Sequence, residues 1–398
     1  MTISRAGPRT RTVELRSDPD AEMSPRPLAI VLGDSNLLKP LVRERIPCAL
    51  AIPSDAPLRY SRHARHVLPW NDDDTERHSL RLIAFAADQP VSPVLLFQSD
   101  AQLLWVSRNR DQLSSVARFA IADRDLVDQL VDKTAFARLA DRHRLPVPPT
   151  VVLSERDSYA PPRDAPIPGV LKPATRTIDD KWQRIAGDRK VLTVSSPSAL
   201  DALRQQLEAY GRPLLLQHEI AGPETRIESY HVYIDAAANV VAEFTGRKIR
   251  TFPLEKGITT SVEVLPIRDV LALGRQVVER IGLTGVAKLD FKRAADGALY
   301  LLEINPRFTL WNNPGSVAGF NIPAAVYADL VGLARPSFRH GPYRARWFNF
   351  NDLAAARASG ISLVRWLTWL ARERPTSGLS FDDPMPTMEL LWQLIRRR

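Results

Sequence analysis

Two carboxylates and an amide are predicted to meet on one face of a β-hairpin in the last third of the chain. The two strands are separated by Asp296-Gly297, a dipeptide that favours a two-residue type I′ turn. With that turn, counting outward pairs Asp290 with Glu303 and Lys288 with Asn305. Directly opposed residues lie about 5 Å apart at Cβ and share one face of the sheet. The pattern therefore brings the oxygens of Asp290, Glu303 and Asn305 to one spot.

Opposed carboxylates repel each other unless a cation lies between them, and oxygen ligands of this kind favour Mg²⁺, or Mn²⁺ in its place, over Zn²⁺. The alternative is an ordinary amphipathic hairpin whose charged face meets solvent. The apolar residues Leu301, Leu302 and Ile304 argue against it, because they indicate a strand covered on both faces. An unpaired carboxylate at Glu303 would be costly there. The hairpin is therefore a candidate metal site.

The bulk composition is that of a globular protein with a sizeable core. The chain has 398 residues, of which 44% are hydrophobic, a single cysteine and a formal net charge of +9. The lone Cys48 excludes an internal disulfide, and the lack of a long apolar run or secretory signal favours a cytoplasmic protein. The excess charge is scattered arginine rather than basic runs interleaved with aromatics, so nucleic acid is not an expected partner.

The N-terminal part divides into an arm and a small domain. Residues 1–26 are rich in Arg, Pro, Ser and Asp and are expected to be disordered, and whether translation starts at Met1 or Met23 is left open. Residues 27–125 alternate buried-strand and helix patterns, which predicts a small parallel α/β sheet. Gly33 stands alone after the first strand, so the glycine pattern is not that of a dinucleotide-binding fold.

The sequence Leu302-Glu303-Ile304-Asn305-Pro306-Arg307, with Asp290 on the preceding strand, resembles the Mg²⁺-binding strand of the ATP-grasp superfamily. The resemblance spans about 131–331 and implies ATP and Mg²⁺ as cofactors. It also implies an α/β protein whose main domain has the ATP-grasp fold, which is of the α+β type. Its parts would be a Rossmann-like pre-ATP-grasp domain over 27–125, a two-lobed ATP-grasp domain over 126–335 and a helical C-terminal extension over 336–398.

The resemblance assigns further residues to the nucleotide. Lys172, which follows a buried apolar run, and Lys133, at the start of a helix, would contact the phosphates. The alternative to a phosphate contact is that the Lys172 ammonium simply reaches solvent. The hinge between the lobes would hold the adenosine: Gln217 the adenine amino group, His218, Glu219 and Ile220 the base through main-chain groups, and Glu224 the ribose hydroxyls.

Catalytic roles are implied for Lys248 and Arg307. Lys248 would reach the γ-phosphate or the second substrate, whereas the nearby Arg250 is expected to be solvated. Arg307 follows the metal strand, and its planar fork of donors suits an acyl phosphate and the later oxyanion.

Two loops complete the implied site. The glycine-rich flap of many family members is missing, so Thr175 or Thr177 would close over the phosphates. The loop Trp311–Ser316 would line the acceptor pocket. The only close histidine pair, His63 and His66, lies in an arginine-rich stretch and is expected at the surface.

Together these residues predict an ATP-dependent carboxylate–amine ligase that works through an acyl phosphate and releases ADP and phosphate. Its partners would be a small-molecule carboxylate and amine, and self-association is left open. A carbamoyl-phosphate-forming or biotin-carboxylase-like enzyme fits less well, because the chain has neither a biotinylated domain nor an internal duplication. A second class also stays open: a non-catalytic nucleotide-binding protein or a membrane-surface scaffold.

The C-terminal tail is predicted to form two amphipathic helices, at 361–372 and 388–398. Packing of their tryptophans against the catalytic body is the simpler interpretation. Peripheral membrane contact through 361–398 is the alternative.

Overall fold

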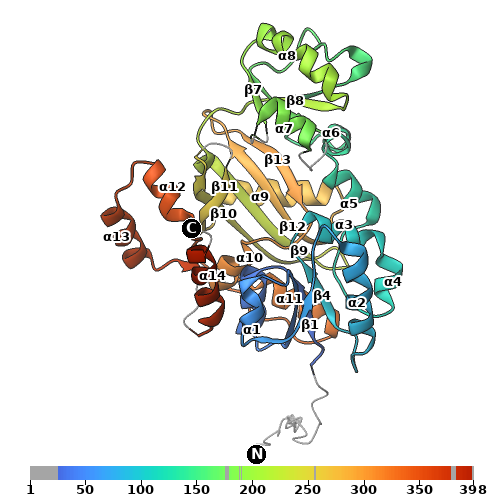
Figure 1. Cartoon of the computed structure of the whole chain (residues 1–398), viewed down its shortest axis with the longest axis vertical. Coiled ribbons are helices and arrows are strands. Elements are labelled where there is room, and N and C mark those ends of the chain that lie inside the picture. Colours follow the sequence, from blue (N-terminus) through green and yellow to red (C-terminus); the bar gives the residue numbers. More distant parts are fainter. Residues whose placement is uncertain are drawn as a thin grey trace, which may run out of the picture.

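The computed structural model describes residues 26–174, 179–187, 189, 191–254, 257–377 and 382–396. The predicted arm, apart from Arg26, lies outside these residues, as do Met23, Thr175 and Thr177. The described chain forms three sheets, which we call the N-terminal sheet, the small-lobe sheet and the central sheet (Figure 1).

The N-terminal sheet is the parallel α/β sheet that the sequence predicts. Its strands, in the order β3-β2-β1-β4, are Ala64–Pro69, Cys48–Ile52, Ala29–Leu32 and Val94–Phe97. The main helices of this part are α1 (Ser35–Arg43), α2 (Thr75–Ala87) and α3 (Asp100–Arg108). β1, β2 and β4 are buried along their whole length, which explains their continuous apolar runs. Because the strands are parallel, the loops that follow β1 and β4 meet at one edge of the sheet.

The small-lobe sheet forms the top of the molecule in Figure 1 and has a core of its own. Its antiparallel strands, in the order β5-β8-β6-β7, are Thr150–Leu153, Leu214–His218, Gly169–Pro173 and Leu192–Val194. Helices α7 (Asp180–Ala186) and α8 (Pro197–Tyr210) pack on it. In this core, the rings of Trp182 and Tyr210 meet edge to face with centroids 5.8 Å apart.

The central sheet has seven strands in the order β13-β12-β9-β10-β11-β14-β15. In that order they are Leu299–Asn305, Gly285–Arg293, Ile227–Ile234, Val240–Phe252, Ile258–Val264, Ala345–Phe348 and Thr376–Ser377. Helices α9 (Arg268–Arg280) and α11 (Ile322–Val331) pack against this sheet. The sequence predicts the hairpin strands β12 and β13, but it gives no signal for β11, because Thr259, Thr260 and Ser261 interrupt its apolar pattern.

The hairpin of β12 and β13 has the predicted pairing of Asp290 with Glu303, but it reaches that pairing by another route. The turn holds three residues rather than two, because Ala294 N donates to Ala298 O at 2.8 Å. That turn alone would shift every pair by one residue. An extra residue on β13 at Leu302 forms a bulge that restores the register at the two carboxylates. The predicted two-residue turn is therefore wrong, and its error is cancelled by the bulge.

Helix α11 lies between the N-terminal sheet and the central sheet, in contact with β4 on one side and with β9 and β10 on the other. One apolar core joins Ile30 of the N-terminal sheet to Val232 of the central sheet. A second core, on the opposite faces, joins Val31 to Phe244. This packing brings the loops after β1 and β4 toward the end of β13.

The C-terminal segment contains α12 (Asp352–Ala358), α13 (Leu363–Glu373) and α14 (Met385–Arg396). Both predicted tail helices are present, although α14 begins three residues before the predicted start. None of the helices in the described part of the chain combines the length and the apolar character needed to cross a membrane.

A buried carboxylate attaches this segment to the central sheet. Asp352 accepts two hydrogen bonds from Arg250, at 2.8 Å from Nε and 2.6 Å from Nη2, and others from Thr260 and Trp366. The Arg250 guanidinium also lies over the Trp369 ring, 4.4 Å from its centroid. The expectation that Arg250 is solvated is therefore wrong, because its partners lie on segments about 100 residues later in the chain.

We expect Asp352→Ala to lower the free energy of unfolding by about 3–5 kcal/mol, because it leaves Arg250 buried without its partner. The matched control is Asp201→Ala, which removes an exposed ion pair with Arg204 and should cost no more than about 1 kcal/mol. Thermal and urea unfolding measure both. Equal stabilities of the two variants would contradict the anchoring role of Asp352.

Candidate functional site

A cleft opens between the small-lobe sheet and the central sheet. It encloses about 350 Å³ and is lined from both sides. Its lining includes most of the predicted site residues: Lys172, Gln217, His218, Glu219, Ile220, Glu224, Lys248, Asp290 and Glu303. A pocket of about 70 Å³ shares Lys172, Gln217 and Glu303 with the cleft and adds Lys133. The fold thus brings together the residues that were predicted to hold the nucleotide, except Thr175 and Thr177, which lie outside the described residues.

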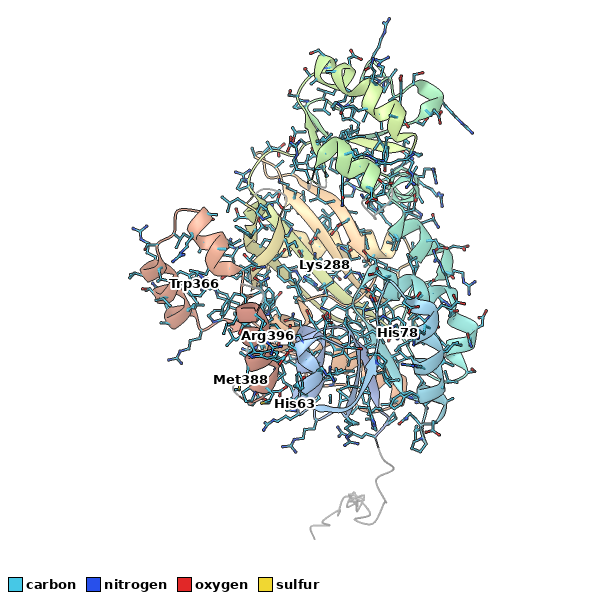
Figure 2. All side chains as sticks on the ribbon, in the orientation of Figure 1. His63, His78, Lys288, Trp366, Met388 and Arg396 are labelled. Carbon is cyan, nitrogen blue, oxygen red and sulfur yellow. The ribbon has the colours of Figure 1, made fainter. Side chains whose placement is uncertain are left out.

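Asp290, on β12, is buried and fully partnered. Ser229 Oγ donates to one carboxylate oxygen at 2.5 Å, and Lys288 Nζ donates to the other at 2.6 Å. Lys288 lies on β12, next to the edge strand β13 of the central sheet (Figure 2). Burial raises the pKa of Asp290, but the charges of Lys288 and Lys248 and the hydrogen bonds outweigh it and hold that pKa below its ordinary value. Asp290 is therefore an anion at neutral pH.

Glu303 and Asn305, on β13, are the other predicted metal ligands. Asn305 Nδ2 donates to Glu303 Oε1 at 2.9 Å, and Glu303 lies opposite Asp290 across the hairpin. Glu303 itself is exposed to the cleft, so the prediction of a strand covered on both faces is wrong at this residue. The reason is that the cleft, rather than a further layer of structure, lies over this part of β13.

This donor set fits Mg²⁺. No group of three or more His, Cys, Asp or Glu side chains that could hold a metal occurs among the described residues. Mg²⁺ does not require one, because it binds through one or two carboxylates together with waters and phosphate oxygens. Buried Asp290 and cleft-facing Glu303 supply the two carboxylates, and Asn305 supplies an amide oxygen.

Two lysines lie on the small-lobe side of the cleft. Lys172 Nζ donates to Gln217 Oε1 at 2.9 Å, and Lys133 Nζ donates to the carbonyl of Pro173 at 3.0 Å. Burial lowers the pKa of the Lys172 ammonium, and the charge of Glu303 offsets this only in part. A partly desolvated ammonium that faces a cleft favours an anionic ligand, which supports the phosphate role over the solvent-facing alternative.

The hinge residue Glu224 lies between two lysines of the central sheet. Its oxygens are 3.8 Å from Lys248 Nζ and 3.7 Å from Lys292 Nζ. Lys292 was not predicted to be part of the site. It stands two residues after Asp290 on the same face of β12, so strand alternation was the signal that could have identified it.

Arg307 lies beyond the metal strand, at the contact with the N-terminal sheet. Its Nε donates to Asp100 at 2.6 Å, and its Nη1 donates to the Gln98 carbonyl at 2.9 Å. The Gln98 side chain in turn accepts from Asp34 N at 2.9 Å. The absence of a side chain at Gly33 lets the Gln98 side chain lie close to the main chain, because a Cβ at Gly33 would be 2.4 Å from Gln98 Oε1. Gly33 therefore leaves room for the Gln98 side chain, and the main-chain carbonyl of Gln98 accepts from Arg307.

The predicted acceptor loop is instead the short helix α10 (Asn312–Val317). It is preceded by Trp311, which is buried against the His231 ring at a centroid distance of 4.9 Å. His231 also stacks on Phe244. Burial and, to a smaller extent, the charge of Lys288 hold the pKa of His231 well below its ordinary value, so its imidazole is neutral. His231 was missed because a single histidine in an apolar strand gives no signal of its surroundings.

Comparison with known proteins gives a fold and one sequence relative. No family model matches the chain. A D-aspartate ligase of Enterococcus faecium is 23% identical over 291 residues, which cover 69% of this chain and 68% of that protein. The ADP complex of N5-carboxyaminoimidazole ribonucleotide synthetase superposes with a TM-score of 0.59 and 16% identity, over 80% of each chain. A biotin carboxylase of Campylobacter jejuni, solved with an ATP ligand, has a TM-score of 0.60 and 16% identity, over 81% of this chain and 74% of that one.

We expect Lys172→Ala to weaken ADP binding by about 10- to 100-fold, the loss of one hydrogen bond between charged groups. The matched control is Lys181→Ala, an exposed lysine of α7 in the same lobe, which should bind ADP as the unchanged protein does. Isothermal titration measures both affinities. If the two variants bind ADP equally well, Lys172 does not contact the phosphates.

Proposed function

The chain has the ATP-grasp fold, and from that premise we propose that it is an ATP-dependent carboxylate–amine ligase that forms an amide through an acyl phosphate. The observation that carries the proposal is the meeting of Asp290, Glu303, Lys172 and Lys248 in one cleft. Two carboxylates that can hold a metal, surrounded by ammonium groups that can hold phosphates, are the set that phosphoryl transfer from ATP requires.

In the proposed complex the nucleotide lies in the cleft between the lobes. Main-chain groups of His218, Glu219 and Ile220, with the Gln217 side chain, hold adenine, and Glu224 accepts from the ribose. Lys248 and Lys292 support this role, because they fix the Glu224 carboxylate from the side of the central sheet. Lys172 and Lys133 donate to the phosphates from the small lobe.

The metal site belongs to the same proposal. Asp290, Glu303 and Asn305 would hold Mg²⁺, which neutralises charge on the β- and γ-phosphates when it is bound. Ser229 and Lys288 orient the Asp290 carboxylate from the neighbouring positions of the sheet.

The first chemical step makes the acyl phosphate. An oxygen of the substrate carboxylate attacks the γ-phosphorus of ATP, and the bond from that phosphorus to the ADP oxygen breaks. Lys248 and Lys172 stabilise the negative charge that is redistributed in this transfer. The carboxylate carbon then carries a phosphate, which is a good leaving group.

The second step forms the amide and releases phosphate. The amine attacks the acyl carbon, the C–O bond to phosphate breaks, and the amine loses a proton. Arg307 would hold the oxyanion of this step, because Asp100 and Gln98 fix its Nε and Nη1. Its Nη2 makes no hydrogen bond with the described residues in this structure and is the group assigned to the substrate.

The substrates are proposed at the level of class. The likeness to a D-aspartate ligase makes D-aspartate the first carboxylate to test, followed by other D- and L-amino acids. Amines and amino acids are the acceptors of this class. A non-catalytic scaffold is disfavoured, because a protein that has lost the reaction has no need to keep Asp290 and Glu303 opposed. The phosphate lysines Lys172 and Lys133 are also present.

We expect Asp290→Asn and Glu303→Gln each to lower kcat by about 100-fold or more, since each removes charge that acts on the transferring phosphoryl group. Glu303→Gln should leave the melting temperature nearly unchanged because Glu303 faces the cleft, whereas Asp290→Asn should lower it because buried Lys288 loses its ion pair. The matched control is Asp296→Asn in the exposed turn of the same hairpin, which should keep normal turnover. The turnover of all three variants is measured as the rate of ADP release with a substrate pair found by screening. Normal turnover of either site variant would refute the hairpin as the metal site.

The acyl phosphate makes an isotopic prediction. A substrate carboxylate labelled with heavy oxygen should deliver one labelled atom to the inorganic phosphate that is released, because the C–O bond to phosphate breaks in the second step. Mass spectrometry of the phosphate measures the transfer. Label in AMP together with pyrophosphate would show an adenylate route instead and would overturn the mechanism.

A further inference from the structure

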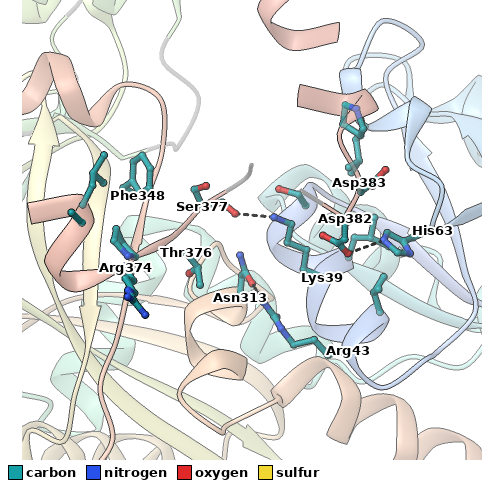
Figure 3. A pocket seen from close by; sticks show the side chains of 18 of the residues that line it. Lys39, Arg43, His63, Asn313, Phe348, Arg374, Thr376, Ser377, Asp382 and Asp383 are labelled. Atoms are coloured by element: carbon teal, nitrogen blue, oxygen red, sulfur yellow. Dashed lines mark hydrogen bonds and ion pairs between the residues drawn. The ribbon is translucent and has the colours of Figure 1, made fainter. Parts of the chain in front are cut away.

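A second and larger cavity lies between the N-terminal sheet and the C-terminal segment. It encloses about 1110 Å³ and shares no lining residue with the nucleotide cleft or its adjoining pocket. Figure 3 shows Phe348 and Arg374 on one side of it, with Lys39, Arg43 and His63 on the other. His63, expected at the surface from the sequence, is half-buried in this wall. The volume is several times that needed for an amino acid, so a larger ligand fits.

Most of the cavity wall is apolar. Leu38 and Val42 come from α1, Phe348 from β14, and Leu367 and Leu370 from α13. These side chains come from segments about 300 residues apart in the chain, so the cavity exists only because the C-terminal segment closes over α1. A wall of this kind favours a hydrocarbon ligand.

Two cations of the wall form no close ion pair with a carboxylate of the described residues, although the charge of Asp382 acts on Arg43. Arg43 donates to Ser316 Oγ at 2.5 Å and to Asn313 Oδ1 at 2.8 Å, both neutral groups, and no ion pair joins it to a carboxylate of the described residues. Burial lowers the pKa of the Arg43 guanidinium. The Arg374 side chain makes no hydrogen bond or ion pair within the described part of the chain.

The acids of the same wall are already engaged. Asp383 is buried and accepts from Ser61 Oγ at 2.5 Å and from Arg62 N at 3.2 Å. Asp382 lies 3.4 Å from His63 Nε2. The wall thus carries three cations, Lys39, Arg43 and Arg374, against the two acids Asp382 and Asp383, which leaves it with an excess of positive charge.

The two helices beside the cavity expose apolar side chains. α13 exposes Leu363, Val364 and Leu367, and α14 exposes Met385, Met388, Leu391, Trp392 and Ile395. Leu367 belongs to both the cavity wall and this exposed set. Figure 2 shows Met388 and Arg396 on α14, with Trp366 on α13 above them. An apolar cavity beside exposed apolar side chains suits a ligand with a long hydrocarbon chain.

We propose that this cavity binds an amphiphilic anion, a molecule with a hydrocarbon chain and a phosphate or carboxylate head. The chain packs against the apolar wall, and the head pairs with Arg43, while exposed Arg374 adds positive charge on the opposite side of the cavity. Such a ligand is either a soluble single-chain molecule or a lipid taken from a bilayer.

The test titrates dodecyl phosphate, below its micelle concentration, into the full-length protein. No nucleotide is present, so the result does not depend on the ligase proposal. We expect saturable binding, while dodecyltrimethylammonium and inorganic phosphate bind at least about tenfold more weakly, since each lacks one of the two recognised parts. The double variant Arg43→Gln, Arg374→Gln should lose at least about tenfold in affinity for dodecyl phosphate. The matched control, Arg365→Gln, changes an exposed arginine of α13 outside the cavity and should bind normally.

A second variant keeps the test clear of folding effects. Ala371 lines the cavity and is also exposed, so Ala371→Trp places a large side chain in the cavity without disturbing the core, and it should weaken binding of dodecyl phosphate at an unchanged melting temperature. Sedimentation with vesicles of equal phosphatidylcholine and phosphatidylglycerol separates the sources: co-sedimentation that Ala371→Trp reduces assigns a bilayer lipid, and protein that stays in the supernatant assigns a soluble amphiphile. Failure to bind dodecyl phosphate, or equal binding by Ala371→Trp, would overturn the proposal.

Discussion

The opposition of Asp290 and Glu303 across the β12–β13 hairpin is the constraint on which the site depends. Two carboxylates held side by side repel each other, so the surrounding structure must supply positive charge and hydrogen-bond donors. Lys288 and Ser229 do this for Asp290, and Asn305 does it for Glu303. The same arrangement leaves Glu303 facing the cleft, where a metal and phosphates can complete the balance of charge.

The two outer parts of the chain shape the surroundings of this hairpin. The N-terminal sheet contributes no residue to the nucleotide cleft among those described, but its Asp100 and Gln98 fix Arg307 just beyond the metal strand. The C-terminal segment is held to the central sheet by Asp352 and closes over α1 to form the large cavity. The cleft and the large cavity therefore lie in different parts of the molecule and have no lining residue in common.

Much of the site could be predicted from the sequence because its key residues are close together in the chain. The pairing of Asp290 with Glu303 follows from counting along one hairpin, although the count succeeded only because the longer turn and the bulge at Leu302 cancel. Contacts between distant segments could not be predicted in this way. Arg250 with Asp352 and the cavity wall at His63 depend on segments far apart in the sequence, and nothing in the local pattern of either shows its partner.

The central claim is that the hairpin carboxylates bind a metal together with the nucleotide, and the dependence of ADP affinity on Mg²⁺ tests it most directly. Titration of ADP into the unchanged protein, once with Mg²⁺ and once with a chelator, gives the two dissociation constants. If Asp290 and Glu303 share a metal with the phosphates, Mg²⁺ should tighten ADP binding by at least about tenfold, or about 1.4 kcal/mol. Equal affinities with and without Mg²⁺ would contradict the account.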